Sequence, residues 1–138
     1  MKTSYGDQAN NEKFGMSLAV ARLSNDGDAG LDHIIAGAPD ADNGGTQRGL
    51  VRVLRTTAGN LGVQQTLNGK GGNGDRFGYS LAAGGDLNGD GDSDLIIGSP
   101  QTAGIGYVDI YYGDTNTSFE TTLDTRFDSS TAGDHYGH

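Results

Sequence analysis

An internal repeat constrains the fold of this chain more than any other feature of its sequence. An aromatic residue followed by glycine recurs about every 60 residues, at Phe14-Gly15, Phe77-Gly78 and Tyr136-Gly137. The first two copies are each followed by a β-branched apolar run that ends at a proline, Pro39 or Pro100. Short apolar runs between glycine-rich turns predict β-strands, and their fixed period predicts a series of similar β-units.

Four strands are expected in each repeat unit. The first covers 14–21 in unit one and 77–84 in unit two, with large and small side chains alternating. Because successive side chains of a strand point to opposite faces, each sheet has one mostly bulky face and one of Gly, Ser and Ala. Such sheets suit packing on both sides, bulky face against small face. The other strands are predicted at 34–39, 49–54 and 63–67, and at 95–100, 106–111 and 118–123.

The predicted fold is all-β, built of β-propeller blades that are each a four-stranded antiparallel sheet. The 138 residues form part of one propeller domain and supply about two blades. Repeat 1 is expected at about 11–73, repeat 2 at about 74–132, and the start of repeat 3 at about 133–138. Because the last residues end inside a predicted first strand, we expect the chain to be an excerpt of a longer protein.

A calcium-binding loop is predicted between the first two strands of unit two. Oxygen-bearing side chains recur at every second position from Asp86 to Asp94, and Gly91 holds the sixth position. Calcium takes six to eight oxygen ligands, and a loop that coils around the ion presents alternate residues to it. The expected ligands are the side chains of Asp86, Asn88, Asp90 and Asp94 and the backbone carbonyl of Asp92.

Two other interpretations of this loop fit the residues less well. An EF-hand requires a bidentate carboxylate at the twelfth position, where this chain has Ile97. An ordinary turn that binds nothing is also rich in Asp, Asn and Gly, because these residues are common turn formers. Carboxylates this close together would repel one another in a turn without a counter-ion, which favours the cation site.

The corresponding loop of unit one is longer and allows two registers. One register keeps three carboxylates at the calcium spacing, with Ala29 in place of the sixth-position glycine: Ser24, Asp26, Asp28, Gly30 and Asp32. The other register, counted back from Pro39, places Asn25, Gly27, Ala29 and His33 at the ligand positions. The second set has almost no oxygen ligands. The loop of unit one is therefore a weaker calcium candidate than the loop from Asp86 to Asp94.

With these motifs, the chain resembles the FG-GAP repeats of integrin alpha-subunit β-propellers and their bacterial relatives. The two halves of the motif are Phe14-Gly15 with Gly37-Ala38-Pro39, and Phe77-Gly78 with Gly98-Ser99-Pro100. The resemblance extends from about Asn11 to the end of the chain and includes the loop from Asp86 to Asp94. It implies a seven-bladed ring with calcium in the hairpin between the first and second strands of a blade.

The resemblance also implies a function. It suggests a non-enzymatic module, stabilised by calcium, with a structural, adhesion or protein-interaction role. A protein or glycan ligand is expected on the rim opposite the calcium loops, formed by residues 40–48, 68–76, 101–105 and 124–135. Further blades of a parent chain are also expected partners. The alternative is an accessory propeller of a secreted enzyme, such as a phospholipase, whose catalytic domain lies outside this chain.

Composition and charge exclude several other classes. The net charge of −9 argues against nucleic acid and anionic membranes as partners. No segment is apolar enough to insert in a membrane, and the absence of cysteine excludes disulfides. The N-terminus lacks the apolar stretch of a signal peptide, but weak calcium loops suit an extracellular or cell-surface location.

No catalytic constellation stands out in the sequence. The histidines are His33, His135 and His138, and their positions favour structural or solvent-facing roles. The chain has neither a phosphate-binding loop with Lys and Ser/Thr nor a nucleophile elbow. Two blades alone would leave one bulky and one small-residue face open, so we expect self-association or marginal folding.

Overall fold

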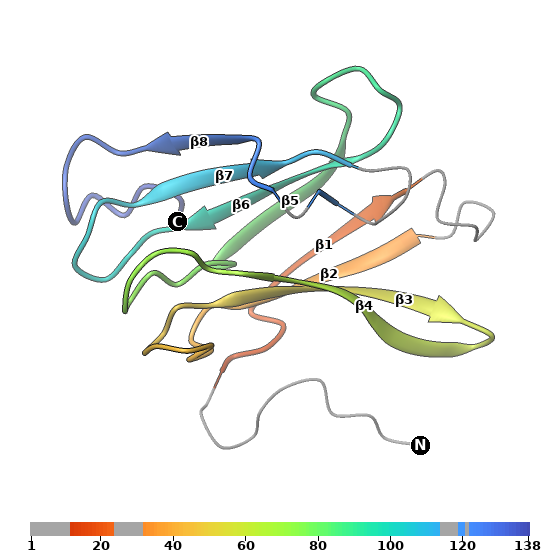
Figure 1. The fold of residues 1–138 in the computed structure, drawn as a ribbon, viewed down its shortest axis with the longest axis horizontal. Helices are drawn as coiled ribbons and strands as arrows, with labels where there is room; N and C mark the ends of the chain where they lie inside the picture. The colour runs from red at the N-terminus through yellow and green to blue at the C-terminus, as the bar shows by residue number, and fades with distance from the viewer. Residues whose placement is uncertain (1–11, 24–31, 114–118, 121) are drawn as a thin grey trace.

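The computed structural model describes residues 12–23, 32–113, 119–120 and 122–138, and consists of two four-stranded antiparallel sheets (Figure 1). The first sheet contains β1 (Ser17–Arg22), β2 (Asp32–Ala38), β3 (Leu50–Thr57) and β4 (Asn60–Asn68), and the second contains β5 (Ser80–Gly85), β6 (Asp94–Ser99), β7 (Tyr107–Tyr111) and β8 (Thr125–Asp128). In both sheets the strands lie in chain order. The all-β prediction is confirmed, and each sheet is one propeller blade.

Helices are absent from the part of the chain that the structure describes. No described segment is therefore a helix that could cross a membrane. The glycine-rich connections and short β-branched runs account for this, because they favour tight turns and strands over helical turns.

The two blades share one strand register, so the sequence repeat is also a structural repeat. Ser17 pairs with Gly37 across β1 and β2, and Ser80 pairs with Gly98 across β5 and β6. The aromatic-glycine motif precedes these strands as a turn and is not part of them. Gly15 and Gly78 have φ of 85° and 84°, a conformation that favours glycine. The first strands therefore begin three residues later than the alternation of side chains predicts.

The main hydrophobic core lies between the two blades, where β1 runs beside β5 (Figure 1). Its members include Ala21, Ile35 and Val53 of the first blade and Leu95 and Ile97 of the second. Leu81 and Ala83 on the bulky face of β5 pack against this cluster, as does Ala19 on the small face of β1. The predicted packing of a bulky face on a small face is therefore observed at this junction.

The backbone of the first sheet also lies close to the backbone at the start of the second blade. The Ser17 hydroxyl donates a hydrogen bond to the Gly78 carbonyl across 2.6 Å. A side chain at Gly37 would collide with the same carbonyl oxygen. Glycine at position 37 therefore lets the start of the second blade lie directly on the first sheet.

The fourth strand of the second blade differs from its prediction. It covers Thr125–Asp128, whereas the sequence pattern favoured 118–123. Within that predicted range, Phe119 is fully buried, and the Gln65 side chain of β4 binds both its backbone N–H and its carbonyl, at 3.0 and 2.7 Å. The apolar residues that suggested a strand serve instead to fill the core between the blades. Residues 118 and 121 lie outside the described part of the chain.

Candidate metal centre

The candidate metal loop joins the first two strands of the second blade, as predicted. Asp86 follows the end of β5 at Gly85, and Asp94 is the first residue of β6. The loop turns at Gly89 and Gly91, whose φ values are 84° and 95°. Since side chains rarely adopt this conformation, glycine at these positions permits the tight coil.

Asp86 organises the first half of the loop through backbone hydrogen bonds. Its carboxylate accepts the N–H groups of Gly89 at 2.6 Å, Asp90 at 3.1 Å and Gly91 at 2.9 Å. These bonds close successive turns around one carboxylate, in the manner of Asx-turns. The loop is therefore held in a coil by its own first acidic residue.

Asp94 connects the loop to the blade. This side chain is buried and accepts the Leu87 N–H at 2.5 Å and the Gly113 N–H at 2.9 Å. Leu87 lies at the start of the loop and Gly113 lies beyond the end of β7. A buried carboxylate that accepts two amide donors fixes the loop ends to the second sheet.

The middle of the loop is more exposed. The Asn88 amide donates to Asp90 Oδ2 at 2.7 Å, and the Asp92 N–H donates to Asp90 Oδ1 at 2.9 Å. The backbone hydrogen bond from Asp92, followed by that from Asn88, lowers the pKa of Asp90. The Asp90 carboxylate is therefore ionised at neutral pH, which a hard cation requires of its ligand.

The residues fit calcium by donor chemistry. Four aspartates and one asparagine lie within nine positions, from Asp86 to Asp94, and all have hard oxygen donors. Among the described residues, however, no three His, Cys, Asp or Glu side chains form a group that could hold a metal ion. The carboxylates accept backbone amides instead, and the Asn88 amide donates to Asp90.

The weaker candidate loop of unit one falls mostly outside the described residues. Ser24, Asp26, Asp28 and Gly30 lie there, and Asp32 is the first residue of β2. Asp32 is exposed and forms an ion pair with Arg22 at 3.5 Å. His33, the ligand position of the other register, is buried, with Nε2 3.0 Å from Gln64 Oε1.

The predicted rim loops lie in a row at the other end of the strands. The Thr46 N–H donates to the Asn73 side chain at 2.9 Å, and the Thr102 N–H donates to the Gly74 carbonyl at 2.9 Å. The Gly133 N–H donates in turn to Gly104 at 3.2 Å. These bonds connect the four segments 40–48, 68–76, 101–105 and 124–135 into one edge, because antiparallel hairpins place alternate connections at the same end.

A buried polar cluster under this rim has no clear signal in the sequence. The Tyr107 hydroxyl donates to Asp75 at 2.5 Å, and the Gln101 amide and the Gly71 N–H donate to the same carboxylate at 3.0 and 3.1 Å. Burial raises the pKa of Asp75 and also that of Tyr107. The sequence does not indicate this cluster, because two of the three partners of Asp75, Tyr107 and Gln101, come from other segments of the chain.

The comparisons with known proteins agree with this fold. Residues 77–111 match the family model described as FG-GAP repeat. Integrin alpha-2 of Mus musculus is 39% identical over 115 residues, which cover 81% of this chain and 10% of the relative. Integrin alpha-7 of Mus musculus is 42% identical over 101 residues, which cover 72% of this chain and 8% of the relative. The chain thus spans about a tenth of the length of these relatives.

The matched residues include the motifs on which the resemblance was based. The range 77–111 begins at Phe77-Gly78, contains the loop from Asp86 to Asp94, and ends with β7. Combined with two four-stranded propeller blades, this match defines the class of protein. The chain is an FG-GAP repeat protein, similar to integrin alpha subunits.

Proposed function

We propose that this chain is a calcium-binding FG-GAP propeller module with a structural, adhesion or protein-interaction role and no catalytic activity of its own. The observation that carries the proposal is the loop between β5 and β6, which places four aspartates and one asparagine within nine positions of an FG-GAP repeat. The names of the relatives, integrin alpha-2 and integrin alpha-7, support the adhesion role and an extracellular or cell-surface location.

The proposed ligands are the side chains of Asp86, Asn88, Asp90 and Asp94 and the carbonyl of Asp92. Bound calcium would supply the positive charge that offsets these clustered carboxylates. Asp86 already holds the loop in a coil, and Asp94 already fixes its ends to the sheet. Asn88 would have to present its carbonyl oxygen, so its amide contact with Asp90 would change on binding.

A macromolecular ligand is proposed on the opposite rim. The segments 40–48, 68–76, 101–105 and 124–135 form one hydrogen-bonded edge there. Protein and glycan ligands both fit such an edge, because loops with exposed polar groups at one end of a rigid sheet are common recognition surfaces. Further blades of a longer protein would extend the same edge.

Titration calorimetry of the 138-residue chain with calcium tests the metal site. We expect binding with a dissociation constant on the order of 10⁻⁴ to 10⁻³ M, as in extracellular calcium modules. At about 100 times this constant the ion should stabilise the folded chain by roughly 2.7 kcal/mol, so calcium should raise the melting temperature and EDTA should reverse the change.

Two variants distinguish the loop from a general charge effect. Asp90→Ala should abolish most of the heat and most of the thermal shift, because it removes a central ligand. Asp128→Ala removes an exposed carboxylate of β8, outside the loop, and should leave both unchanged. Equal loss of calcium binding in the two variants, or a melting curve insensitive to calcium, would contradict the proposal. Two sites per chain would show that the Asp26, Asp28 and Asp32 loop also binds.

A further inference from the structure

An asparagine followed by glycine occurs at four places in this chain: Asn43-Gly44, Asn68-Gly69, Asn73-Gly74 and Asn88-Gly89. Asn68 ends β4, and the other three steps lie in connections between strands. Such a step is chemically labile, because glycine has no side chain to hinder attack of its backbone nitrogen on the side-chain carbonyl carbon of the asparagine. The four steps are alike in sequence, so the fold decides which of them can react.

In three of the four steps the glycine N–H is held by a hydrogen bond. The donor-to-acceptor distance is 3.1 Å for Gly69, 2.8 Å for Gly74 and 2.6 Å for Gly89. The acceptors are the carbonyls of Gly49 and Thr46 and the carboxylate of Asp86. An N–H held in this way points at its acceptor, so the nitrogen cannot attack the asparagine until that bond breaks.

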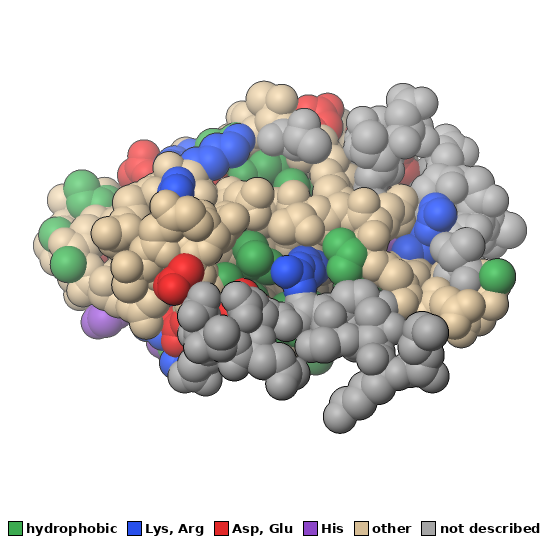
Figure 2. Space-filling model, turned by 60° about the horizontal axis from the view of Figure 1, so that its bottom comes forward, with side chains coloured by type: hydrophobic (Ala, Val, Ile, Leu, Met, Phe, Trp, Pro, Cys, Tyr) green, Lys and Arg blue, Asp and Glu red, His purple; other side chains and the backbone are tan. Residues whose placement is uncertain are grey.

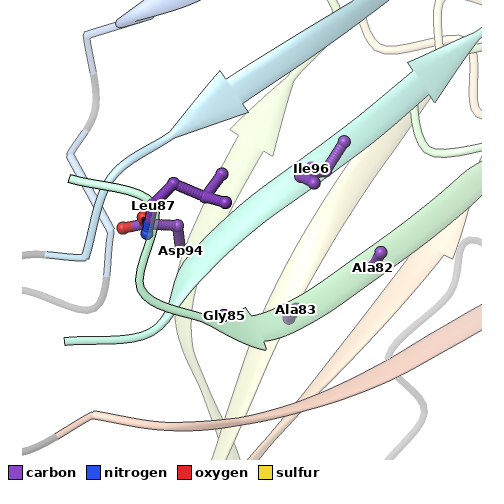
Figure 3. Close-up of a pocket in the computed structure, with 6 residues that line it drawn as sticks. All are labelled: Ala82, Ala83, Gly85, Leu87, Asp94 and Ile96. Carbon is purple, nitrogen blue, oxygen red and sulfur yellow. Dashed lines mark hydrogen bonds between the residues drawn. The ribbon is translucent and has the colours of Figure 1, made fainter. Parts of the chain in front are cut away.

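The asparagine side chain is also held in the candidate calcium loop. The Asn88 side-chain carbonyl accepts the Asp90 N–H at 3.1 Å. Leu87, which precedes Asn88, donates its N–H to the buried Asp94 carboxylate at 2.5 Å, and Figure 3 shows these two residues next to each other. Asn73 is fixed in a similar way, because its side-chain oxygen accepts the Thr46 N–H at 2.9 Å.

Gly44 differs from the other three glycines. Its N–H makes no hydrogen bond to the described residues, and Gly44 is exposed while Asn43 is half-buried. The two residues are the centre of a tight turn between β2 and β3, which the Gly45 N–H closes by donating to the Asp42 carbonyl at 2.6 Å. Their φ values of 33° and 81° define a type I′ turn, for which Asn-Gly is the favoured pair. The turn that selects this pair thus leaves its reactive nitrogen open to solvent.

A fixed positive charge lies beside the same turn. The Arg48 guanidinium donates to the carbonyls of Gly71 and Gly69 at 3.1 and 3.3 Å. Its Nη1 lies 3.7 Å from the position that a Cβ on Gly44 would occupy. Attack by the Gly44 nitrogen develops negative charge on that nitrogen and then on the side-chain oxygen of Asn43. A cation already held next to developing negative charge stabilises it.

We propose that Asn43 is a site of spontaneous covalent modification, at which the asparagine is converted to aspartate and isoaspartate. The Gly44 nitrogen loses its proton and bonds to Cγ of Asn43, ammonia leaves, and a cyclic imide forms. Water then opens this imide. Its attack at Cγ gives aspartate, and its attack at the backbone carbonyl carbon gives isoaspartate, in which the main chain runs through the former side chain.

The modification would change the charge of the rim segment 40–48. Lys, Arg, Asp and Glu side chains are interspersed on the face that Figure 2 turns forward, with no large area of one sign. On such a surface, one added carboxylate beside Arg48 changes the potential over about 8–10 Å, the screening length in physiological salt. The conversion itself depends on neither the calcium site nor the proposed ligand. Only its effect on ligand binding rests on the proposed function of the rim.

Mass spectrometry of the full chain after prolonged incubation at neutral pH tests the proposal. Trypsin cleaves after Lys and Arg and places the four steps in separate fragments, 23–48, 56–70, 71–76 and 77–126. Incubation in water enriched in heavy oxygen marks the conversions that occur before digestion in ordinary water. We expect Asn43 to convert at least about tenfold faster than Asn73 or Asn88, because breaking a hydrogen bond adds to the barrier of those steps. Chromatography should also resolve an isoaspartate product, which direct hydrolysis of the amide does not give.

Two controls separate the effect of the fold from intrinsic reactivity. In guanidinium chloride the hydrogen bonds are lost, so the four steps should convert at similar rates. In the folded chain, Asp86→Ala removes the acceptor of the Gly89 N–H and should raise conversion at Asn88 by about tenfold.

Three results would overturn the proposal: equal conversion of the four steps in the folded chain, slower conversion at Asn43 than at Asn73, or a product at Asn43 without isoaspartate. Calcium binding is not measured in this experiment. Failure here therefore leaves the proposed metal site standing, and failure of the metal site leaves this modification standing.

Discussion

At the scale of single residues, carboxylates determine most of the polar structure of this protein. Asp86 and Asp94 hold the candidate calcium loop through backbone amides, and Asp75 gathers three donors beneath the rim. These residues are aspartates in places where glutamate would extend past its partners. The short side chain allows a carboxylate to accept N–H groups from its own turn.

Asp75→Asn is the residue-scale prediction. The amide would present a donor where the carboxylate now accepts hydrogen bonds from Tyr107, Gln101 and the Gly71 N–H. One of these three donors would lose its acceptor on residue 75. We therefore expect the free energy of unfolding to fall by about 1–3 kcal/mol. Chemical denaturation measures it, and Asp128→Asn on the exposed part of β8 is the control.

The stability difference between the unmodified chain and Asp75→Asn should also depend on pH. Because burial raises the pKa of Asp75 above its ordinary value of 3.8, the folded state binds this proton more tightly than the unfolded state. The contribution of this proton to the free energy of unfolding is fully present below pH 3.8. It is lost as the pH rises through the pKa of Asp75 in the folded state. The stability of the unmodified chain relative to Asp75→Asn should therefore fall over this window. A difference that stays constant with pH would contradict the assignment.

At the scale of elements, an ion pair positions the fourth strand of the second blade. Arg126 of β8 binds Asp109 of β7 with two hydrogen bonds, at 2.6 and 2.7 Å, and Asp109 is buried. The Arg126 guanidinium also stacks on the Tyr107 ring, 3.8 Å from its centroid. The hydrogen bonds to Asp109 raise the pKa of Arg126, so the guanidinium stays charged. These contacts explain why the strand forms at Thr125–Asp128 and not at 118–123.

Arg126→Ala is the element-scale prediction. It leaves the Asp109 carboxylate buried without its cation, which typically costs about 3–5 kcal/mol. Arg22→Ala breaks the exposed pair with Asp32 and should cost about 1 kcal/mol or less. Denaturant unfolding of the two variants provides the comparison. Equal losses would show that the Arg126 pair does not anchor β8.

At the scale of the whole molecule, stability depends on the junction between the blades. The largest core cluster contains residues of both sheets, so the described residues of either blade form no comparable core by themselves. The close backbone approach of Gly37 to Gly78 is the tightest geometric condition on this junction. Close-packed interiors accept little added volume at such a point.

Gly37→Ala is the prediction at this scale. The added methyl group would meet the Gly78 carbonyl and the Ser17 hydroxyl, so the blades must shift apart. We expect a loss of at least about 1–3 kcal/mol, the usual cost of overpacking. Gly62→Ala in β4 adds a methyl group where nothing lies within 4 Å and should be nearly neutral. Thermal melting of both variants checks this, and equal melting temperatures would refute the role of the junction.

The sequence by itself determined the local features of this protein. The period-two alternation of Leu81 and Ala83 with smaller residues predicted the packing of β5, because side-chain direction follows from backbone geometry alone. The repeat and the aspartate spacing likewise predicted the strand-to-strand loop from Asp86 to Asp94, and the resemblance of these motifs to FG-GAP repeats predicted the class of protein. The alternation and the aspartate spacing depend on residues that are close together in the chain, and the repeat is visible from the residue order alone.

Only the tertiary structure decided which distant groups meet. Phe119 fills the core between the blades instead of extending a strand, because Gln65 of the other sheet binds its backbone. Asp75 is buried and bonded to Tyr107 and Gln101, which come from other segments of the chain. The physical reason is that a buried polar group must pair with whichever group is packed next to it. Which groups are packed together depends on both sheets, and not on the order of residues in either one.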